Sequence, residues 1–383
     1  MSMILRNFCY YHGDDCRTGQ AMVLADGHIR HLLTDEALPA DARAQAVDCG
    51  GLLLAPGFID TQVNGGGGVM FNSHPDLETL DTMRRGHWCG GTTAMLPTLI
   101  TDSHEHMQQA VTAVAQALDS LPGIVGIHLE GPHLNRERRG THAAGLIRPF
   151  DALTESLLEP LPPHCCLLTV APETLPAGTI RRLRARGLHV SAGHTSATHA
   201  QIVRALAEGL DGFTHLYNAM TPMSSREPGV VGAALAHEHS WCGIIVDGIH
   251  LHPVTAALAI RAKARGRMVL VTDAMATVGS SHDHFELYGE TIRVQDGRCV
   301  NADGVLAGSA LDMASAVRNC VSLLGLALPE ALRMASLYPA QWLGLDQERG
   351  YIAPGWRADL VLLNAALEVE KTWVGAELCY ARP

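Results

Sequence analysis

The sequence lacks several features that mark membrane, secreted or nucleic-acid-binding proteins. It has no run of about 18 apolar residues, so we expect no transmembrane helix and no membrane partner. Positive charge is in the minority, with 28 Lys and Arg against 39 Asp and Glu. The resulting net charge of −11 argues against nucleic acid as a partner. Residues 1–12 contain no apolar segment followed by a small-residue cleavage site, so we expect no signal peptide.

Cys-x-x-Cys pairs are also absent, although the chain has ten cysteines among 383 residues. In a chain of this length that pattern predicts free thiols and a reducing, cytoplasmic location. Apolar material, in contrast, is plentiful, since hydrophobic residues make up 47% of the chain and charged residues 17%. That composition is enough for a large core and excludes a disordered chain.

Short apolar runs recur along the chain at intervals that leave room for a helix between them. Runs that are apolar throughout are typical of parallel strands buried on both faces, so the alternation predicts an α/β fold. Eight such units in about 220 residues fit a (β/α)8 TIM-like barrel. A doubly wound open sheet is the alternative, but no Gly-x-Gly-x-x-Gly turn follows the first run. The runs are residues 54–62, 92–98, 124–130, 166–172, 188–194, 212–218, 242–247 and 268–273.

The two ends of the chain have a different pattern, with short period-two segments between turn residues. They predict a small β-sandwich domain formed by residues 1–53 and 351–383, beside a barrel domain of residues 54–350. Residues 285–306 predict a hairpin with a turn at Asp296 and Gly297. Because this segment follows the eighth strand, we expect it to overhang the barrel mouth. Helices are predicted over residues 310–324 and 329–343.

Active sites of such barrels gather at the carboxyl ends of the strands. Glu130, His194 and His215 fall at the ends of three different runs and form the His₂Glu set of a catalytic Zn²⁺ with one open position. Fe²⁺, Co²⁺ or Mn²⁺ are alternatives for the same ligands. Asp273 ends the eighth run and is suited to take a proton from an attacking water. Each residue alone has an ordinary structural interpretation, but charges buried together need a partner or a metal.

Several motifs, in order along the chain, resemble one family of hydrolases. Residues 54–60 are similar to the start of an amidohydrolase-superfamily barrel. Residues 128–132, 191–194, 215–220, 226–229, 247–250, 272–274 and 306–309 resemble the N-acetylglucosamine-6-phosphate deacetylase family. The resemblance implies hydrolysis of N-acetyl-D-glucosamine 6-phosphate to D-glucosamine 6-phosphate and acetate in amino-sugar catabolism. It also implies a homodimer whose subunits each hold a divalent metal.

The resemblance assigns roles to the residues that match the family's motifs. Glu130, His194 and His215 match its metal ligands, and Asp273 matches its catalytic acid and base. His142 matches the histidine that polarises the substrate carbonyl. Some substrate-binding groups can come from a neighbouring subunit. The implied substrate-binding residues are His142, Ala143, Asn218, Ala219, Arg226 and His250.

The first strand departs from the wider superfamily, in which it closes with a His-x-His pair that binds a second metal. Gln62 and Asn64 replace that pair here, and amides are poor Zn²⁺ ligands. The fourth run also lacks the Lys that could carry a bridging carbamate. Both features favour one metal. Three alternatives stay open: an N-acetylgalactosamine-6-phosphate deacetylase, another mononuclear amidohydrolase, and a non-enzymatic metal-binding barrel, which would need no Asp273.

Overall fold

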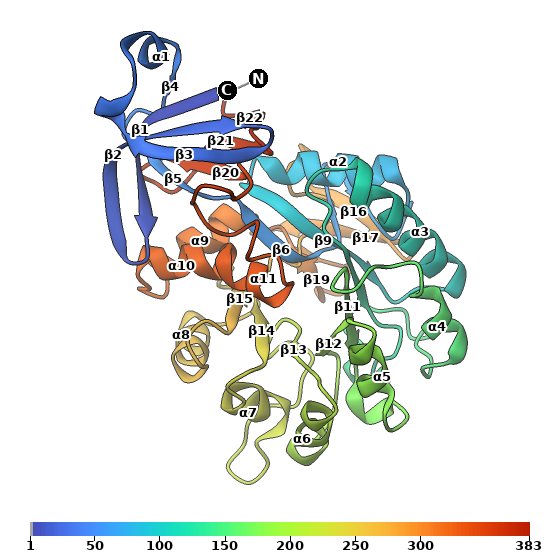
Figure 1. Cartoon of the computed structure of the whole chain (residues 1–383). Helices are drawn as coiled ribbons and strands as arrows, with labels where there is room; N and C mark the ends of the chain where they lie inside the picture. Colours follow the sequence, from blue (N-terminus) through green and yellow to red (C-terminus); the bar gives the residue numbers. More distant parts are fainter. Residues whose placement is uncertain (1–2) are drawn as a thin grey trace.

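The computed structural model describes residues 3–383, and its main body is a parallel barrel surrounded by helices (Figure 1). The eight barrel strands pair in chain order. The barrel closes where Val63 forms a parallel bridge to Ala274, beyond the last strand. The predicted (β/α)8 barrel is therefore confirmed. Its strands are β6 (Phe58–Val63), β9 (Thr92–Ile100), β10 (Ile127–Glu130), β11 (Cys166–Val170), β12 (His189–Ala192), β13 (Gly212–Phe213), β14 (Trp241–Ile244) and β15 (Met268–Leu270).

The helices around the barrel begin at side-chain caps and bury one apolar face. Asp76 and Ser103 each accept a hydrogen bond from the backbone N–H three residues later. Leu80 and Val114 are among the helix residues that pack against the strands in one core. No helix in the described chain is long and apolar enough to cross a membrane. The principal helices are α2 (Leu77–Trp88), α3 (His104–Ser120), α4 (Ala152–Leu157), α5 (Thr179–Ala185), α6 (His199–Ala207), α7 (Gly229–Ala236), α8 (Pro253–Ala262), α9 (Met313–Ser322), α10 (Leu328–Ala335) and α11 (Leu337–Trp342).

Several predicted element boundaries are wrong, and two of these corrections have a clear physical reason. The first run is not one strand, because β5 (Leu53–Pro56) pairs with β20 (Leu360–Leu363) and only β6 enters the barrel. The chain changes sheets at Gly57, whose N–H donates to the Asp359 carbonyl. The helix predicted over residues 329–343 breaks at Ser336. Pro339 has no N–H for the carbonyl four residues earlier, so it is disfavoured inside one long helix but is tolerated in the first turn of α11.

Strands from both ends of the chain meet in a second sheet, which lies at the upper left of the view (Figure 1). Phe8, Leu54 and Trp373 are buried in its core, so residues far apart in sequence share one packing layer. The sandwich built from both termini is confirmed, while its exact division from the barrel stays a prediction. Residues 1–2 of that predicted domain lie outside the described chain. The strands pair in the order β22 (Glu377–Ala381), β21 (Val369–Val374), β20, β5, β1 (Met3–His12), β2 (Asp15–Ala25) and β3 (His28–Thr34), and β4 (Val47–Asp48) pairs with β1.

The segment after β15 folds into an antiparallel sheet at the mouth of the barrel. It comprises β16 (His284–Leu287), β17 (Glu290–Gln295), β18 (Arg298–Val300) and β19 (Leu306–Ser309). The predicted turn lies between β17 and β18, where Asp296 and Gly297 both have positive φ angles. Ser309 bridges Ala274, so this sheet is joined to the barrel at the end where the strands finish.

Candidate metal centre and active site

The three predicted metal ligands meet at the carboxyl ends of β10, β12 and β13. Glu130 is the last residue of β10, and His194 and His215 follow β12 and β13. The Nε2 atoms of His215 and His194 lie 2.8 Å and 3.2 Å from the same Glu130 oxygen, Oε1. The two Nε2 atoms are 3.1 Å apart. All three residues are buried, and their ligand atoms lie within 4.8 Å of one another.

The hydrogen bonds of His194 show that a cation fits this cluster. His194 Nδ1 lies 2.7 Å from the carbonyl oxygen of Arg138, and because a carbonyl only accepts, Nδ1 carries the hydrogen. In the neutral ring Nε2 then presents a lone pair to the Glu130 carboxylate. Two such acceptors repel each other unless a positive charge lies between them. Two imidazoles and one carboxylate are a ligand set that suits a divalent metal.

The charge of Glu130 depends on these histidines. Burial alone would raise the pKa of its carboxyl, but positive charge on the neighbouring rings of His194 and His215 outweighs burial and holds the pKa well below its usual value. The strand ends carry backbone strain as well. His194, His215 and Asp273 adopt positive φ angles of 47°, 32° and 54°. Such conformations cost about 1–3 kcal/mol each and persist where the surrounding structure holds them, often at functional sites.

Asp273 faces the cluster and is held by the two amides that replace the superfamily's His-x-His pair. Asn64 Nδ2 donates to Asp273 Oδ1 at 2.6 Å, and Gln62 Nε2 donates to the same oxygen at 3.2 Å. Gln62 Nε2 also lies 3.3 Å from each carboxylate oxygen of Glu130. Two neighbouring carboxylates repel each other unless donors or a cation lie between them. Gln62 donates to both Glu130 and Asp273, so a second cation is not needed there. Burial, reinforced by the charge of Glu130, raises the pKa of Asp273 to about 6.

His142 completes the titratable groups around this centre. Its ring lies 4.3 Å from that of His194, measured between centroids, and it is buried. Its Nδ1 is 2.8 Å from Thr101 Oγ1. Burial, with the neighbouring His194, lowers the pKa of His142 well below its ordinary value, so the ring is neutral at physiological pH.

A cavity of about 170 Å³ opens over these groups at the barrel mouth. Four of the six residues predicted to bind substrate line it: His142, Asn218, Ala219 and His250. His250 is also paired with Asp247, its Nδ1 lying 2.6 Å from Oδ2. The sequence analysis missed an apolar part of the lining, made up of Ile100, Ile245, Met275 and Leu306.

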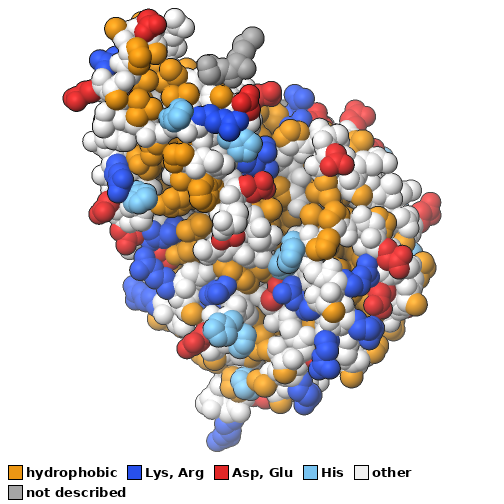
Figure 2. Space-filling model, viewed as in Figure 1, with side chains coloured by type: hydrophobic (Ala, Val, Ile, Leu, Met, Phe, Trp, Pro, Cys, Tyr) orange, Lys and Arg blue, Asp and Glu red, His pale blue; other side chains and the backbone are white. Residues whose placement is uncertain are grey.

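The remaining two predicted substrate-binding residues, Ala143 and Arg226, are not among the lining residues of this cavity. Arg226 is exposed, in the loop that precedes α7 and projects from the barrel (Figure 1). Figure 2 shows a basic side chain at the lower tip of the same view. Among the described residues that line the cavity, none is Lys or Arg. Among the described residues, the lining of this cavity therefore offers no permanent cation to a bound phosphate.

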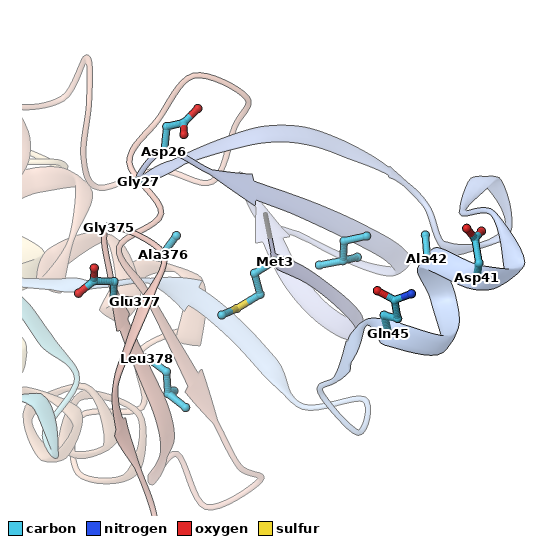
Figure 3. Close-up of a pocket in the computed structure, with 11 residues that line it drawn as sticks. Met3, Asp26, Gly27, Asp41, Ala42, Gln45, Gly375, Ala376, Glu377 and Leu378 are labelled. Carbon is cyan, nitrogen blue, oxygen red and sulfur yellow. The ribbon is translucent and has the colours of Figure 1, made fainter. Parts of the chain in front are cut away.

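A larger hollow, of about 920 Å³, lies at the terminal sheet beside α1 (Ala40–Gln45) (Figure 3). Among the described residues that line it, the charged ones are Asp26, Asp41 and Glu377, all acidic, and none is histidine. Acidic groups repel a phosphate, and the hollow offers no metal-ligand cluster. The barrel cavity is therefore the better candidate for a catalytic site.

Two residues beside His142 also escaped the sequence analysis. The second run was predicted to end at residue 98, but β9 continues to Ile100, so Thr101 stands at the strand end. A polar residue at the carboxyl end of a barrel strand indicates a candidate active-site position. Because the strand was predicted to end three residues before Thr101, this indication was missed. Tyr288, in the turn between β16 and β17, donates a hydrogen bond to the Thr101 carbonyl. That contact depends on how the antiparallel sheet sits on the barrel, and no local sequence pattern reports it.

Comparison with known proteins agrees with the fold. The Amidohydrolase family model matches residues 53–379. An N-acetylgalactosamine-6-phosphate deacetylase from Shewanella sp. (strain ANA-3) is 47% identical over 329 residues, or 85% of this chain and 83% of that protein. An N-acetylglucosamine-6-phosphate deacetylase from Haemophilus influenzae is 34% identical, covering 93% of each. The crystal structure of N-acetylglucosamine-6-phosphate deacetylase from Pasteurella multocida superimposes on this chain with a TM-score of 0.94 at 35% identity. The match covers the whole of both chains. The chain therefore belongs to the amidohydrolase family.

Proposed function

We propose that this enzyme hydrolyses the acetamide of N-acetyl-D-glucosamine 6-phosphate to D-glucosamine 6-phosphate and acetate. The observation that carries the proposal is the cluster of Glu130, His194 and His215 facing Asp273 across one cavity. The relatives named above, which act on N-acetylhexosamine 6-phosphates, support the substrate class. The cysteines are free among the described residues, which supports a cytoplasmic location. A role in amino-sugar catabolism is supported by the substrate class of the relatives.

Glu130, His194 and His215 would hold one divalent cation per subunit. Zn²⁺ suits this set, and Fe²⁺, Co²⁺ and Mn²⁺ are the alternatives. When bound, the cation supplies a Lewis acid that polarises the acetyl carbonyl or the attacking water. The hydrogen bonds from Gln62 and Asn64 to the carboxylates support a single metal.

Asp273 is proposed as the group that moves the proton. Its Oδ1 accepts hydrogen bonds from Asn64 and Gln62, which leaves Oδ2 to take a proton from water as the water attacks the acetyl carbon. The same carboxyl then returns the proton to the departing amine. His142 would stabilise the negative charge that develops on the acetyl oxygen.

The phosphate group is proposed to be held partly by a second subunit. Asn218 and His250 line the cavity, but no Lys or Arg does so among the described residues. Arg226 is exposed in the projecting loop, and Met223 of the same loop is 61% exposed, an apolar group that would favour contact with another chain. In a homodimer, Arg226 of the partner subunit would supply a planar cation that binds phosphate oxygens in pairs.

A second candidate substrate is N-acetyl-D-galactosamine 6-phosphate, because the Shewanella relative that carries this activity in its name is 47% identical to this chain. The two substrates differ only in the configuration at one sugar carbon. A paired kinetic assay of acetate release, on protein of measured metal content, tests both candidates. The gluco epimer should give the higher kcat/KM, and a higher value for the galacto epimer would favour the second candidate.

The assay should include N-acetyl-D-glucosamine without phosphate. If the phosphate anchors the substrate, its removal should lower kcat/KM strongly, because remote binding energy helps to position the reacting amide. Equal kcat/KM with and without the phosphate would show that Arg226 and His250 do not bind a phosphate group. Activity on other amides but on neither hexosamine phosphate would favour another mononuclear amidohydrolase.

A further inference from the structure

Two neighbouring histidines at this site face opposite kinds of backbone group. His194 Nδ1 lies 2.7 Å from a carbonyl oxygen, that of Arg138. His142 Nδ1 instead receives the backbone N–H of Thr101, with nitrogens 3.3 Å apart. A carbonyl can only accept and an amide N–H can only donate. The two rings are therefore set in opposite tautomers.

The backbone N–H of Thr101 determines which ring nitrogen of His142 carries the hydrogen. The Thr101 hydroxyl, 2.8 Å from Nδ1, could either donate or accept, and it also lies 3.5 Å from the carbonyl oxygen of Glu130. The amide N–H has no such choice, so Nδ1 must be the acceptor and the hydrogen of the ring must be on Nε2. His142 lines the cavity, and no protein partner for Nε2 is found in the part of the chain that the structure describes. The Nε2–H is thus free to donate to a ligand.

Thr101 is itself held tightly in place. It is 1% exposed, and its carbonyl accepts a hydrogen bond from the Tyr288 hydroxyl. Tyr288 is 39% exposed as a whole, but desolvation of its hydroxyl raises the pKa, so this group stays a neutral donor. Gly131 has φ +89°, and a Cβ there would lie 2.3 Å from Thr101 Oγ1. Glycine at residue 131 therefore leaves room for the Thr101 hydroxyl, which any larger side chain there would displace.

We propose that Thr101 is a positioning residue with two parts: its backbone N–H sets His142 in the Nε2–H tautomer, and its hydroxyl, the closer partner of Nδ1, holds the ring so that Nε2–H can donate to the acyl oxygen of the substrate. The identity of that acceptor rests on the proposed deacetylase function, while the tautomer rests on the protein's own hydrogen bonds. The opposite tautomer would present a lone pair to the developing oxyanion and repel it. An Nε2–H instead stabilises that charge as it forms.

The kinetic test addresses the hydroxyl: Thr101→Ala keeps the backbone N–H but loses the 2.8 Å hydroxyl contact with Nδ1, whereas Thr101→Ser keeps both. Thr372→Ala is a matched control, because Thr372 is also buried and donates only to the Trp88 carbonyl. We expect Thr101→Ala to lower kcat by roughly 10–100-fold, the usual effect of losing a group that orients a functional ligand. KM and metal content should stay near the parent values, and Thr101→Ser should recover most of kcat. Equal kcat for the Ala and Ser variants would overturn the proposal.

The tautomer is measured separately, by nitrogen NMR of metal-loaded enzyme labelled with ¹⁵N-histidine. The signals of His142 are those that disappear in His142→Gln. In the parent enzyme at pH 7.5 the spectrum should show hydrogen on Nε2 and an unprotonated Nδ1, and hydrogen on Nδ1 would overturn the proposal. If the parent enzyme releases no acetate from any hexosamine phosphate, the proposed function fails, and the NMR result still decides the tautomer.

Discussion

Replacing Asp273 by Asn tests the proton transfer with little change in shape. In the parent enzyme, Asn64 and Gln62 direct their amide nitrogens at Oδ1, at 2.6 Å and 3.2 Å. An asparagine can keep its carbonyl oxygen at that position, so the variant retains both hydrogen bonds. The atom that changes is Oδ2, the oxygen that accepts from neither amide, where NH₂ replaces the proposed proton acceptor.

The expected loss follows from the step that is removed. Proton transfer by a positioned side chain typically contributes 10²–10⁴-fold to the rate, which corresponds to about 3–5 kcal/mol of barrier. Asp273→Asn should therefore lower kcat by at least about 100-fold. KM should change little, because ground-state binding does not need the proton acceptor. Metal content should also persist, since Asp273 lies outside the ligand cluster.

The assay is acetate release at saturating N-acetyl-D-glucosamine 6-phosphate, with metal measured on the same preparation. Asp119→Asn is a suitable control, because Asp119 is an exposed aspartate on α3. The control should keep the parent kcat. A variant at Asp273 that turns over at near the parent rate would refute its role as acid and base. Loss of metal together with activity would instead make Asp273 a ligand, which also contradicts this reasoning.

Three other predictions concern the metal, the pH profile and the antiparallel sheet. Glu130→Gln removes the charged ligand at nearly constant size, so metal content after dialysis should fall well below one ion per chain, and full retention would contradict the ligand role. A base must be ionised to act, and the pKa of Asp273 is raised to about 6 by burial, although an adjacent cation would lower it. The rate should therefore fall as pH drops through 6 or below, and a rate that increases between pH 7 and 5 would exclude this base. Tyr288→Phe removes the donor to the Thr101 carbonyl and should lower kcat at unchanged metal content. The control Tyr351→Phe loses only a contact with His12 and should keep the parent kcat. Equal kcat for the two variants would show that Tyr288 does not support the active site.

The sequence predicts the barrel well because parallel strands buried on both faces must be apolar throughout. Once the barrel is closed, residues at the carboxyl ends of its strands converge on one mouth whatever their separation in the chain. That geometry explains why Glu130, His215 and Asp273 could be placed together in advance. The catalytic and binding roles assigned to them stay predictions.

Features that depend on packing between distant elements escaped the sequence. The contact of Tyr288 with Thr101 requires knowing where the antiparallel sheet rests on the barrel. The split of the first apolar run at Gly57 reflects pairing with a strand contributed more than 300 residues later, so local hydrophobicity does not reveal it. Arg226 lies outside the cavity of its own chain, which only the three-dimensional arrangement could reveal.

The most direct test of the account is acetate release by metal-loaded enzyme whose metal content is known. We predict one divalent ion per chain and hydrolysis of N-acetyl-D-glucosamine 6-phosphate that stops when a chelator removes the ion and resumes when it is restored. Fully loaded protein that releases no acetate from either the gluco or the galacto substrate would contradict the central claim.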